Sequence, residues 1–366
     1  MPVLPDFVKR YLFLAGFILF SAGSCSKKDQ DANSPATAAE ITAFNLAAGQ
    51  HTEISTGANT SVLIRLPDSI TDGSKLIADF TLSPGARATI NGVLQKSGET
   101  VNNFENDLGY LVTAADNLTT KNWPVIVSNN SFSMTWGLGH FIHKTVSNNT
   151  AYNWYIDQAT SGNFASINCG PASATMAIKW ADPAFSKSAL DARMKYESGG
   201  GWWSTNDVHA YLGDNDISHA MIGLSPNADS TRNILEHQLD RSQIVILCLD
   251  MDLVRNGAVS PSRVDKFYTT TPGWGHFIVL KGYKVVDKAV FFEAYDPYSF
   301  GLLNDDQTLK GMNRYYRYED LAAATKSWWQ YAFVIAKKGE SLSLDAVKRS
   351  LDPQRIPIAH SSVPNF

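Results

Sequence analysis

A β-sandwich followed by an α+β domain is the fold that this sequence of 366 residues predicts. Between residues 41 and 128, short alternating runs such as SVLIRL and KLIADFTL are separated by turn residues, and Asn91-Gly92 is a strong hairpin signal. Beyond residue 168, helical segments come first, and apolar strands such as HFIVLKGY and AVFFEAYD follow. Helices that are segregated from antiparallel strands in this way indicate an α+β domain.

The overall composition excludes two classes of protein. With 44% hydrophobic and 18% charged residues, the chain has the composition of a globular protein rather than a disordered one. Its formal net charge is -4, and it contains no long basic run. Because phosphate binding needs clustered Lys and Arg, we expect no nucleic-acid partner.

The first 25 residues have the layout of a signal peptide. Lys9 and Arg10 precede the apolar run YLFLAGFILF, and small residues then lead to Cys25. The run is short for a transmembrane helix, which remains the alternative. The segment AGSC resembles the lipobox of bacterial lipoproteins, although Ala22 stands where that family usually has Leu. The resemblance implies that Cys25 is the lipidated N-terminus.

A flexible tether is expected after the lipobox, in residues 26 to 40. The stretch SKKDQDANSPATAAE is polar and small and contains no large apolar residue. The tether would then attach the folded part of the chain to a membrane of the bacterial cell envelope, where it faces the periplasm or the cell exterior.

Residues 41 to 128 form the predicted sandwich. The string ATINGVLQKSGETVNNF, with LGYLVTAADNLTTKNWPVIV after it, resembles the immunoglobulin-like repeats of bacterial surface lipoproteins. No cluster of Cys, His or carboxylate side chains suggests catalysis in this region, so a spacer is expected, with ligand binding as the alternative.

Residues 129 to 150 are expected to be a polar connector between the two domains. His140 and His143 lie in it, but no Cys or carboxylate stands near them at ligand spacing. Surface or packed histidines are therefore expected, and no metal or cofactor is predicted anywhere in the chain.

The stretch NCGPASATMAIKW places Cys169 at the start of a helix. Pro171 suits the first helical position, where its missing N–H is not needed, and Asp182 and Pro183 close the run. The unpaired amides and the positive end of the helix dipole favour the thiolate, which is the nucleophilic form. The alternative is a buried structural cysteine.

Three further residues are candidates to act with Cys169. Gln158 lies eleven residues before it, and its side-chain amide could hold an oxyanion. His276 begins an apolar strand, and Asp296 closes the next one. A hairpin turning near Val286 and Asp287 would place His276 opposite Asp296 or Pro297, where the carboxylate can orient the imidazole.

These residues together resemble a known family. Gln158, CGPAS at 169 to 173, GHFIVLKGY at 275 to 283 and the Asp-Pro at 296 and 297 are similar to papain-like cysteine peptidases of the double-glycine leader peptidase type and their secreted relatives. The resemblance covers about residues 151 to 337. It implies that Cys169 is the nucleophile, His276 the general base and acid, Asp296 the orienting carboxylate and Gln158 the oxyanion donor.

Two departures from the family bear on the substrate. The loop from Gln158 to Cys169 is somewhat long, and no transporter is attached. Leader cleavage during export is therefore not implied. A peptide or protein is the expected substrate of a membrane-tethered cysteine hydrolase. Acyl transfer by the same triad and a non-catalytic surface binding protein are the alternatives.

Two features of the chain remain. Cys248 lies within IVILCLDMD, a run suited to a buried strand, and is expected to be inert packing that forms no disulfide with Cys169. Residues 338 to 366 are expected to be a C-terminal tail with one short helix, LDAVKRSL, and no readable role.

Overall fold

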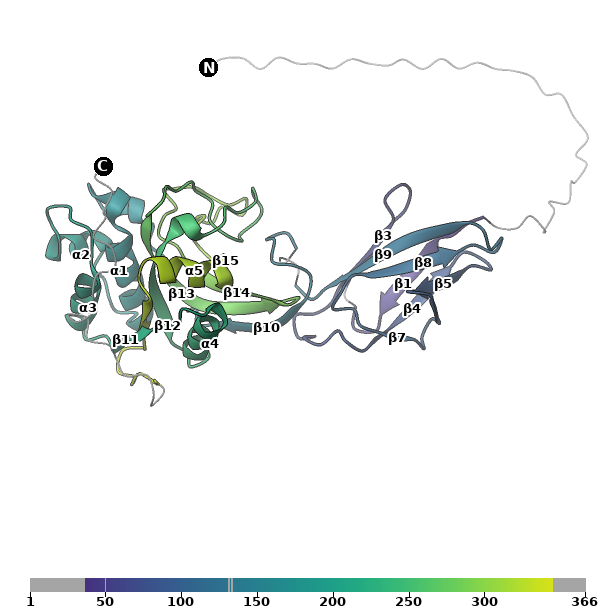
Figure 1. Cartoon of the computed structure of the whole chain (residues 1–366), viewed down its shortest axis with the longest axis horizontal. Helices are drawn as coiled ribbons and strands as arrows, with labels where there is room; N and C mark the ends of the chain where they lie inside the picture. The colour runs from purple at the N-terminus through teal and green to yellow at the C-terminus, as the bar shows by residue number, and fades with distance from the viewer. Residues whose placement is uncertain (1–36, 50, 131, 133, 345–366) are drawn as a thin grey trace, which may run out of the picture.

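The computed structural model describes residues 37–344, apart from residues 50, 131 and 133. Cys25, the signal segment, the helix expected at LDAVKRSL and most of the tether lie outside this part of the chain. Two β-rich lobes are joined by a strand, β10, as Figure 1 shows. Among the described residues, no helix has the length and apolar character needed to cross a membrane.

The N-terminal lobe contains two β-sheets that face each other across a hydrophobic core. One sheet has the strand order β1-β4-β7 and the other β2-β3-β9-β8-β5-β6. All neighbours are antiparallel except β3 and β9, which are parallel. The core between the sheets includes Phe44, Phe104, Tyr110 and Trp123. The strands are β1 (Ile41–Leu46), β2 (His51–Ser55), β3 (Ser61–Arg65), β4 (Leu76–Leu82), β5 (Arg87–Ile90), β6 (Val93–Gln95), β7 (Val101–Asn102), β8 (Leu108–Thr113) and β9 (Thr120–Ser128).

The C-terminal lobe is built on a seven-stranded antiparallel sheet. Its order is β11-β16-β12-β13-β14-β15, and β10 pairs with the second half of β13. The strands are β10 (Ile142–Ser147), β11 (His219–Gly223), β12 (Ile244–Asp250), β13 (Gly275–Val286), β14 (Ala289–Tyr295), β15 (Arg314–Arg317) and β16 (Tyr331–Ile335).

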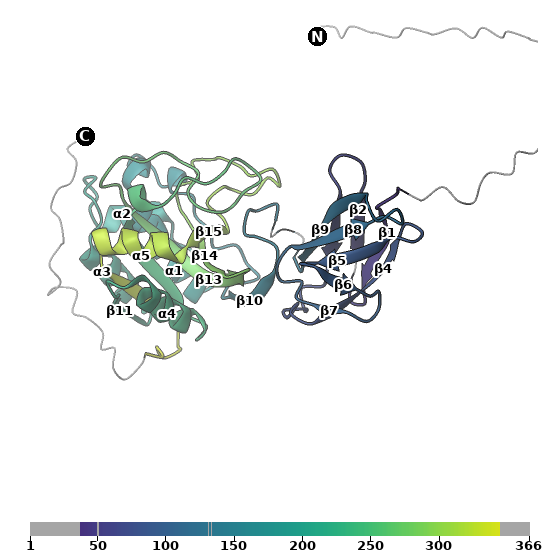
Figure 2. The same ribbon diagram turned by 45° about the vertical axis from the view of Figure 1, so that its right-hand side comes forward.

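Helices cover both faces of this sheet (Figure 2). Helices α1, α2 and α3 share one hydrophobic cluster with the sheet, and α4 and α5 share the other. The α-helices are α1 (Cys169–Ala181), α2 (Ala189–Lys195), α3 (Thr205–Gly213), α4 (Ala228–Leu239) and α5 (Tyr318–Ser327). The short 3₁₀ helices are η1 (Gln158–Thr160), η2 (Ala165–Ile167) and η3 (Met251–Leu253). The described chain is therefore a mixed α/β, multidomain and β-rich protein.

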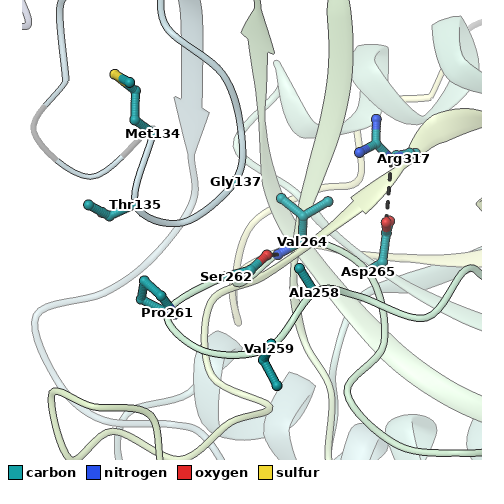
Figure 3. A pocket seen from close by; sticks show the side chains of 10 residues that line it. All are labelled: Met134, Thr135, Gly137, Ala258, Val259, Pro261, Ser262, Val264, Asp265 and Arg317. Atoms are coloured by element: carbon teal, nitrogen blue, oxygen red, sulfur yellow. Dashed lines mark hydrogen bonds and ion pairs between the residues drawn. The ribbon is translucent and has the colours of Figure 1, made fainter. Parts of the chain in front are cut away.

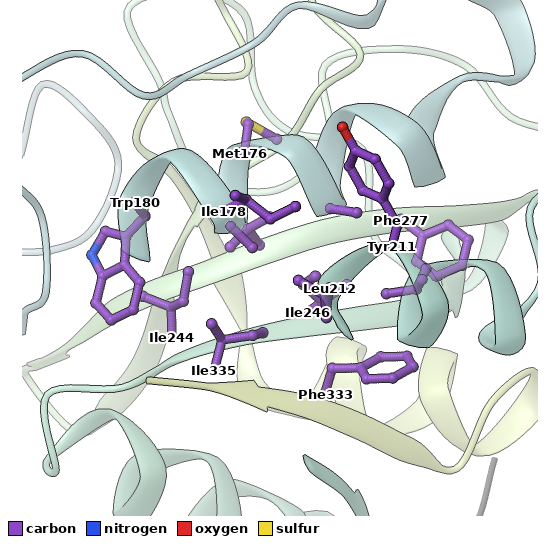
Figure 4. Close-up of a cluster of buried hydrophobic side chains, with 14 of the residues drawn as sticks. Met176, Ile178, Trp180, Tyr211, Leu212, Ile244, Ile246, Phe277, Phe333 and Ile335 are labelled. Atoms are coloured by element: carbon purple, nitrogen blue, oxygen red, sulfur yellow. The ribbon is translucent and has the colours of Figure 1, made fainter. Parts of the chain in front are cut away.

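Helix α1 is the central helix of the C-terminal lobe. Every residue in it except Lys179 is buried, as expected for a helix that is enclosed on all sides. Met176, Ile178 and Trp180 lie in the cluster with side chains of β12, β13 and β16, which Figure 4 shows. This packing places the N-terminus of α1 on the sheet.

The expected connector, residues 129–150, contains a strand of the second lobe. Phe141 is buried in the core of the N-terminal lobe, and β10, which begins at the next residue, pairs with β13. The two side-chain oxygens of Asp287 accept hydrogen bonds from the backbone N–H groups of His140 and Phe141, at 3.0 and 2.8 Å. The sequence did not predict this strand. Only its first residue is buried, so the strand lacks an apolar pattern.

The β13–β14 hairpin forms in a register that differs from the expected one. Its turn is one residue later, at Asp287 and Lys288, so that Val286 pairs with Ala289. The pairing shifts between Leu280 and Gly282 and ends at Val279 with Tyr295. His276 therefore has no direct partner across the hairpin, and its contact with the next strand depends on side chains rather than on register.

Candidate active site

His276 and Asp296 meet at one edge of the C-terminal sheet. His276 is the second residue of β13, and Asp296 follows the last residue of β14. Because these strands are antiparallel neighbours, the start of one lies beside the end of the other. The Nε2 of His276 lies 2.8 Å from Oδ1 of Asp296, and both side chains are buried. The predicted partnership is thus formed in the structure.

Cys169 reaches this pair from the N-terminus of α1. Its thiol lies close enough to His276 to help raise the pKa of that imidazole. Since Asp296 occupies Nε2, the nitrogen left for the thiol is Nδ1. The Ser173 hydroxyl, one turn into the helix, donates to the carbonyl oxygen of Phe277 at 3.1 Å and so fixes α1 to the residue after His276.

Gly170 allows the start of α1 to approach its neighbours closely. A Cβ atom at this position would lie 2.7 Å from Cβ of Trp203 and 3.4 Å from the ring of Phe277. A larger residue would force apart the helix start and the segment that carries Trp203, whereas the approach to Phe277 is an ordinary contact. The glycine after the cysteine therefore allows the start of α1 to pack closely against Trp203.

The electrostatics of the His276–Asp296 pair favour the charged forms. Burial lowers the pKa of His276, but the charge and hydrogen bond of Asp296, with a contribution from Cys169, outweigh it and raise the pKa to about 10. Burial raises the pKa of Asp296, but His276 and the hydrogen bonds of Tyr316 and Tyr298 N–H bring it below its usual value. A buried imidazolium and a buried carboxylate stabilise each other here.

Two tyrosines that the sequence analysis missed hold Asp296. Its Oδ2 accepts hydrogen bonds from the hydroxyl groups of Tyr316, at 2.5 Å, and Tyr268, at 2.9 Å. Burial raises the pKa of both tyrosines well above the usual value, so they remain protonated donors. The backbone N–H of Tyr298 donates to Oδ1 at 2.9 Å. No spacing in the sequence points to these contacts, because they come from different loops and strands.

Gln158 lies beside the strand end that carries Asp296. Its backbone N–H donates to the carbonyl oxygen of Pro297 at 2.8 Å, and its Nε2 donates to that of Ala165 at 2.8 Å. The structure shows no direct bond from Gln158 to Cys169. An amide nitrogen carries two hydrogens, so one remains for a substrate oxygen.

The candidate residues are almost completely covered. The exposed fractions are 4% for Cys169, 1% for His276, 0% for Asp296 and 1% for Gln158. Both Cys169 and Cys248 are free and buried. Burial raises the pKa of Cys248 well above its usual value, which leaves it a neutral thiol.

A separate pocket lies away from these residues. It has a volume of about 340 Å³ and is lined by side chains such as Met134, Val259, Val264 and Asp265, which Figure 3 shows. None of the predicted site residues lines it. His140 and His143 lie near Asp107 and Glu105 at 3.9 and 3.6 Å, and in the described part of the chain no group of three or more His, Cys, Asp or Glu could hold a metal ion.

Comparison with known proteins finds no matching family model and no matching curated protein. A crystal structure of a C39-like peptidase from Bacillus anthracis covers 54% of this chain and 100% of that chain, with 11% identity and a TM-score of 0.30. A structure of a glycoside hydrolase from Bacteroides thetaiotaomicron covers 82% and 90%, with 17% identity and a TM-score of 0.22. At these scores neither neighbour bears on the fold or the activity of this chain.

Proposed function

We propose that this protein is a cysteine peptidase with a papain-like catalytic domain in residues 151–337. The observation that carries the proposal is the position of His276, whose imidazole is hydrogen-bonded to Asp296 and lies close enough to Cys169 for the thiol to help raise the pKa of the imidazole. A thiol at a helix N-terminus, an imidazole and a carboxylate in this order form a nucleophile, a base and an orienting group.

The first half of the reaction forms a thioester. The Cys169 thiolate attacks the carbonyl carbon of the peptide bond, and the negative charge moves to the carbonyl oxygen. The free N–H of Gln158 and the backbone amide of Cys169 are the donors for this oxyanion. As the C–N bond breaks, the His276 imidazolium gives its proton to the departing amine.

The second half hydrolyses the thioester. His276, now neutral, takes a proton from a water molecule, whose oxygen attacks the thioester carbonyl. The carboxylic acid leaves, and the thiolate and imidazolium are restored. Asp296 keeps the imidazole oriented and stabilises its cationic form in both halves.

We further propose that the enzyme is tethered to the bacterial envelope through lipid-modified Cys25. The support is the charged start, apolar run and small residues before Cys25, followed by the polar stretch 26–40. The N-terminal lobe would then be an immunoglobulin-like spacer. If the proposal holds, Cys25→Ala releases the protein from the membrane fraction. A variant that stays in that fraction and keeps residues 1–24 would instead carry a transmembrane anchor.

A peptide-library digest tests the peptidase proposal. The wild type is compared with Cys169→Ala and with Cys248→Ala as the matched cysteine control. Cleavage by the wild type and the control, but not by Cys169→Ala, is the expected result. If a thiol-directed activity probe does not label Cys169 in the wild type or in Cys248→Ala, and no peptide is cleaved, the protein is a binding protein rather than a peptidase. An added amine that appears in the product would show acyl transfer.

A further inference from the structure

Arg193, on α2, is buried beneath the start of α1 with an exposed fraction of 0%. Its Nε donates to Oδ1 of Asn168, the residue before Cys169, at 2.7 Å. Its Nη2 donates to the carbonyl oxygen of Ile167 at 3.4 Å, and its Nη1 to that of Gly201 at 2.5 Å. The guanidinium therefore ties the chain segment that leads into Cys169 to the glycine-rich loop after α2.

These hydrogen bonds leave the charge of Arg193 without a bonded counter-charge. All the acceptors named above are neutral carbonyl or amide oxygens. A buried charge is costly unless an opposite charge compensates it. Burial lowers the pKa of Arg193, and the strongest of the negative charges that oppose this is that of Cys169, ahead of Glu197 and Asp207.

Electrostatic interactions couple Cys169 to titratable side chains on the elements around it. These side chains include His276 on β13, Cys248 on β12, Tyr268 in the loop before β13, and Arg193 on α2. Burial raises the pKa of both Cys248 and Tyr268 well above the usual value, so these two stay neutral. Arg193 and His276 are the two that can be cationic.

We propose that Arg193 is a second cationic partner of the Cys169 thiolate and that it positions the nucleophile through Asn168. The inference rests on the proposed nucleophilic role of Cys169, but not on the identity of the substrate. Whereas His276 loses its proton to the leaving amine during the reaction, a guanidinium keeps its charge. Arg193 therefore supports the thiolate whichever protonation state His276 is in.

Alkylation of Cys169 by iodoacetamide across a pH series tests this inference without any turnover. The rate follows the thiolate fraction, and it is read from the mass of the peptide that contains Cys169. Arg193→Met should move the pH midpoint upward by about one to three units, the usual effect of an adjacent charge. Arg193→Lys should restore much of the shift. Arg263→Met, at an equally buried arginine that stacks on Trp136 and pairs with Asp306, should leave the midpoint unchanged.

Each outcome separates the two proposals. An unchanged midpoint in folded Arg193→Met, or equal shifts in Arg193→Met and Arg193→Lys, would overturn the charge role of Arg193 while the peptidase proposal stands. If Arg193→Met does not fold, Arg193→Gln supplies the test, because glutamine keeps amide donors but removes the charge. Its midpoint should also lie above that of the wild type. Coincidence of the two midpoints would overturn the charge role of Arg193.

Discussion

Cys169 and His276 depend on each other because each supplies what the other lacks. The thiol needs a base to become a nucleophile, and the imidazole has no reaction to catalyse without the thiol. Their contact is made inside the protein, where electrostatic interactions are stronger than in water. The two residues should therefore behave as one unit when they are replaced.

Replacing either residue should abolish turnover to nearly the same extent as replacing both. Cys169→Ala, His276→Ala and the double variant should each lose about 10⁴-fold or more in kcat/KM, because neither residue works alone. Steady-state kinetics on one peptide substrate measures this, with circular dichroism to verify folding. Mild and additive losses in folded variants would show that the pair is not a catalytic unit.

The pH dependence of stability should reveal the coupling of His276 to Asp296. The pKa of His276 is raised from 6.5 to about 10, so its stabilising effect is full below pH 6.5 and is lost as the pH rises towards 10. The pKa of Asp296 is lowered from 3.8, so its effect is present above that pH and is lost as the pH falls below it.

Asp296→Asn removes the carboxylate that causes both shifts. The difference in unfolding free energy between wild type and variant should therefore be largest between pH 4 and 6.5 and should shrink towards pH 10. Denaturant unfolding at a series of pH values measures it. The variant should keep some activity, since an amide can still hold the ring. A difference that does not vary with pH would mean that the pair is not charged.

At the level of secondary-structure elements, β15 contributes to the site through Tyr316. This strand pairs with β14 and brings the tyrosine hydroxyl to Asp296 from the side opposite β13. Tyr315, the preceding residue, lies in a different hydrophobic cluster, beside Trp136. Because successive side chains of a strand point to opposite faces, Tyr316 contacts the candidate site, whereas Tyr315 packs in a separate hydrophobic cluster.

Tyr316→Phe should destabilise the protein more than Tyr315→Phe does. The first change deprives a buried carboxylate of a 2.5 Å hydrogen bond, a loss of about 1–3 kcal/mol in unfolding free energy. The loss should grow above the pKa of Asp296, where the carboxylate is charged. Urea unfolding of the two variants measures the difference. Equal losses would mean that Tyr316 acts only by packing.

In the molecule as a whole, the two lobes share a continuous stretch of chain. Phe141 completes the N-terminal core, and the strand that begins at Ile142 completes the C-terminal sheet. Asn129 binds both backbone groups of Ile142, with its Oδ1 accepting at 2.7 Å and its Nδ2 donating at 2.5 Å. Removal of the first lobe is therefore tolerable only if β10 is kept.

Two truncated chains test whether the C-terminal lobe needs β10 but not the N-terminal lobe. A chain that starts at residue 142 should keep turnover on a small peptide, because no candidate catalytic residue lies in the N-terminal lobe. A chain that starts at residue 148 also lacks β10, which leaves the second half of β13 unpaired on that side, and its thermal midpoint should be clearly lower. If the chain that starts at residue 142 folds but has no turnover, the first lobe shapes the site.

The sequence by itself determined the main elements and the identities of the candidate residues. The helix at Cys169, the strands on either side of His276 and Asp296, and the strand-rich first lobe all have strong local patterns: a proline near a helix start, long apolar runs, and alternation with turn residues. These signals are local, so they can be recognised in the sequence without knowledge of the fold.

The tertiary structure decided what touches these residues. The tyrosines on Asp296 and the arginine below Cys169 come from segments whose patterns show only burial or a helix. The sequence did not reveal strand β10, because only its first residue is buried. The hairpin register depended on a turn and a bulge that the sequence pattern does not specify. Contacts between distant segments follow from how whole elements pack, and no spacing along the chain encodes that packing.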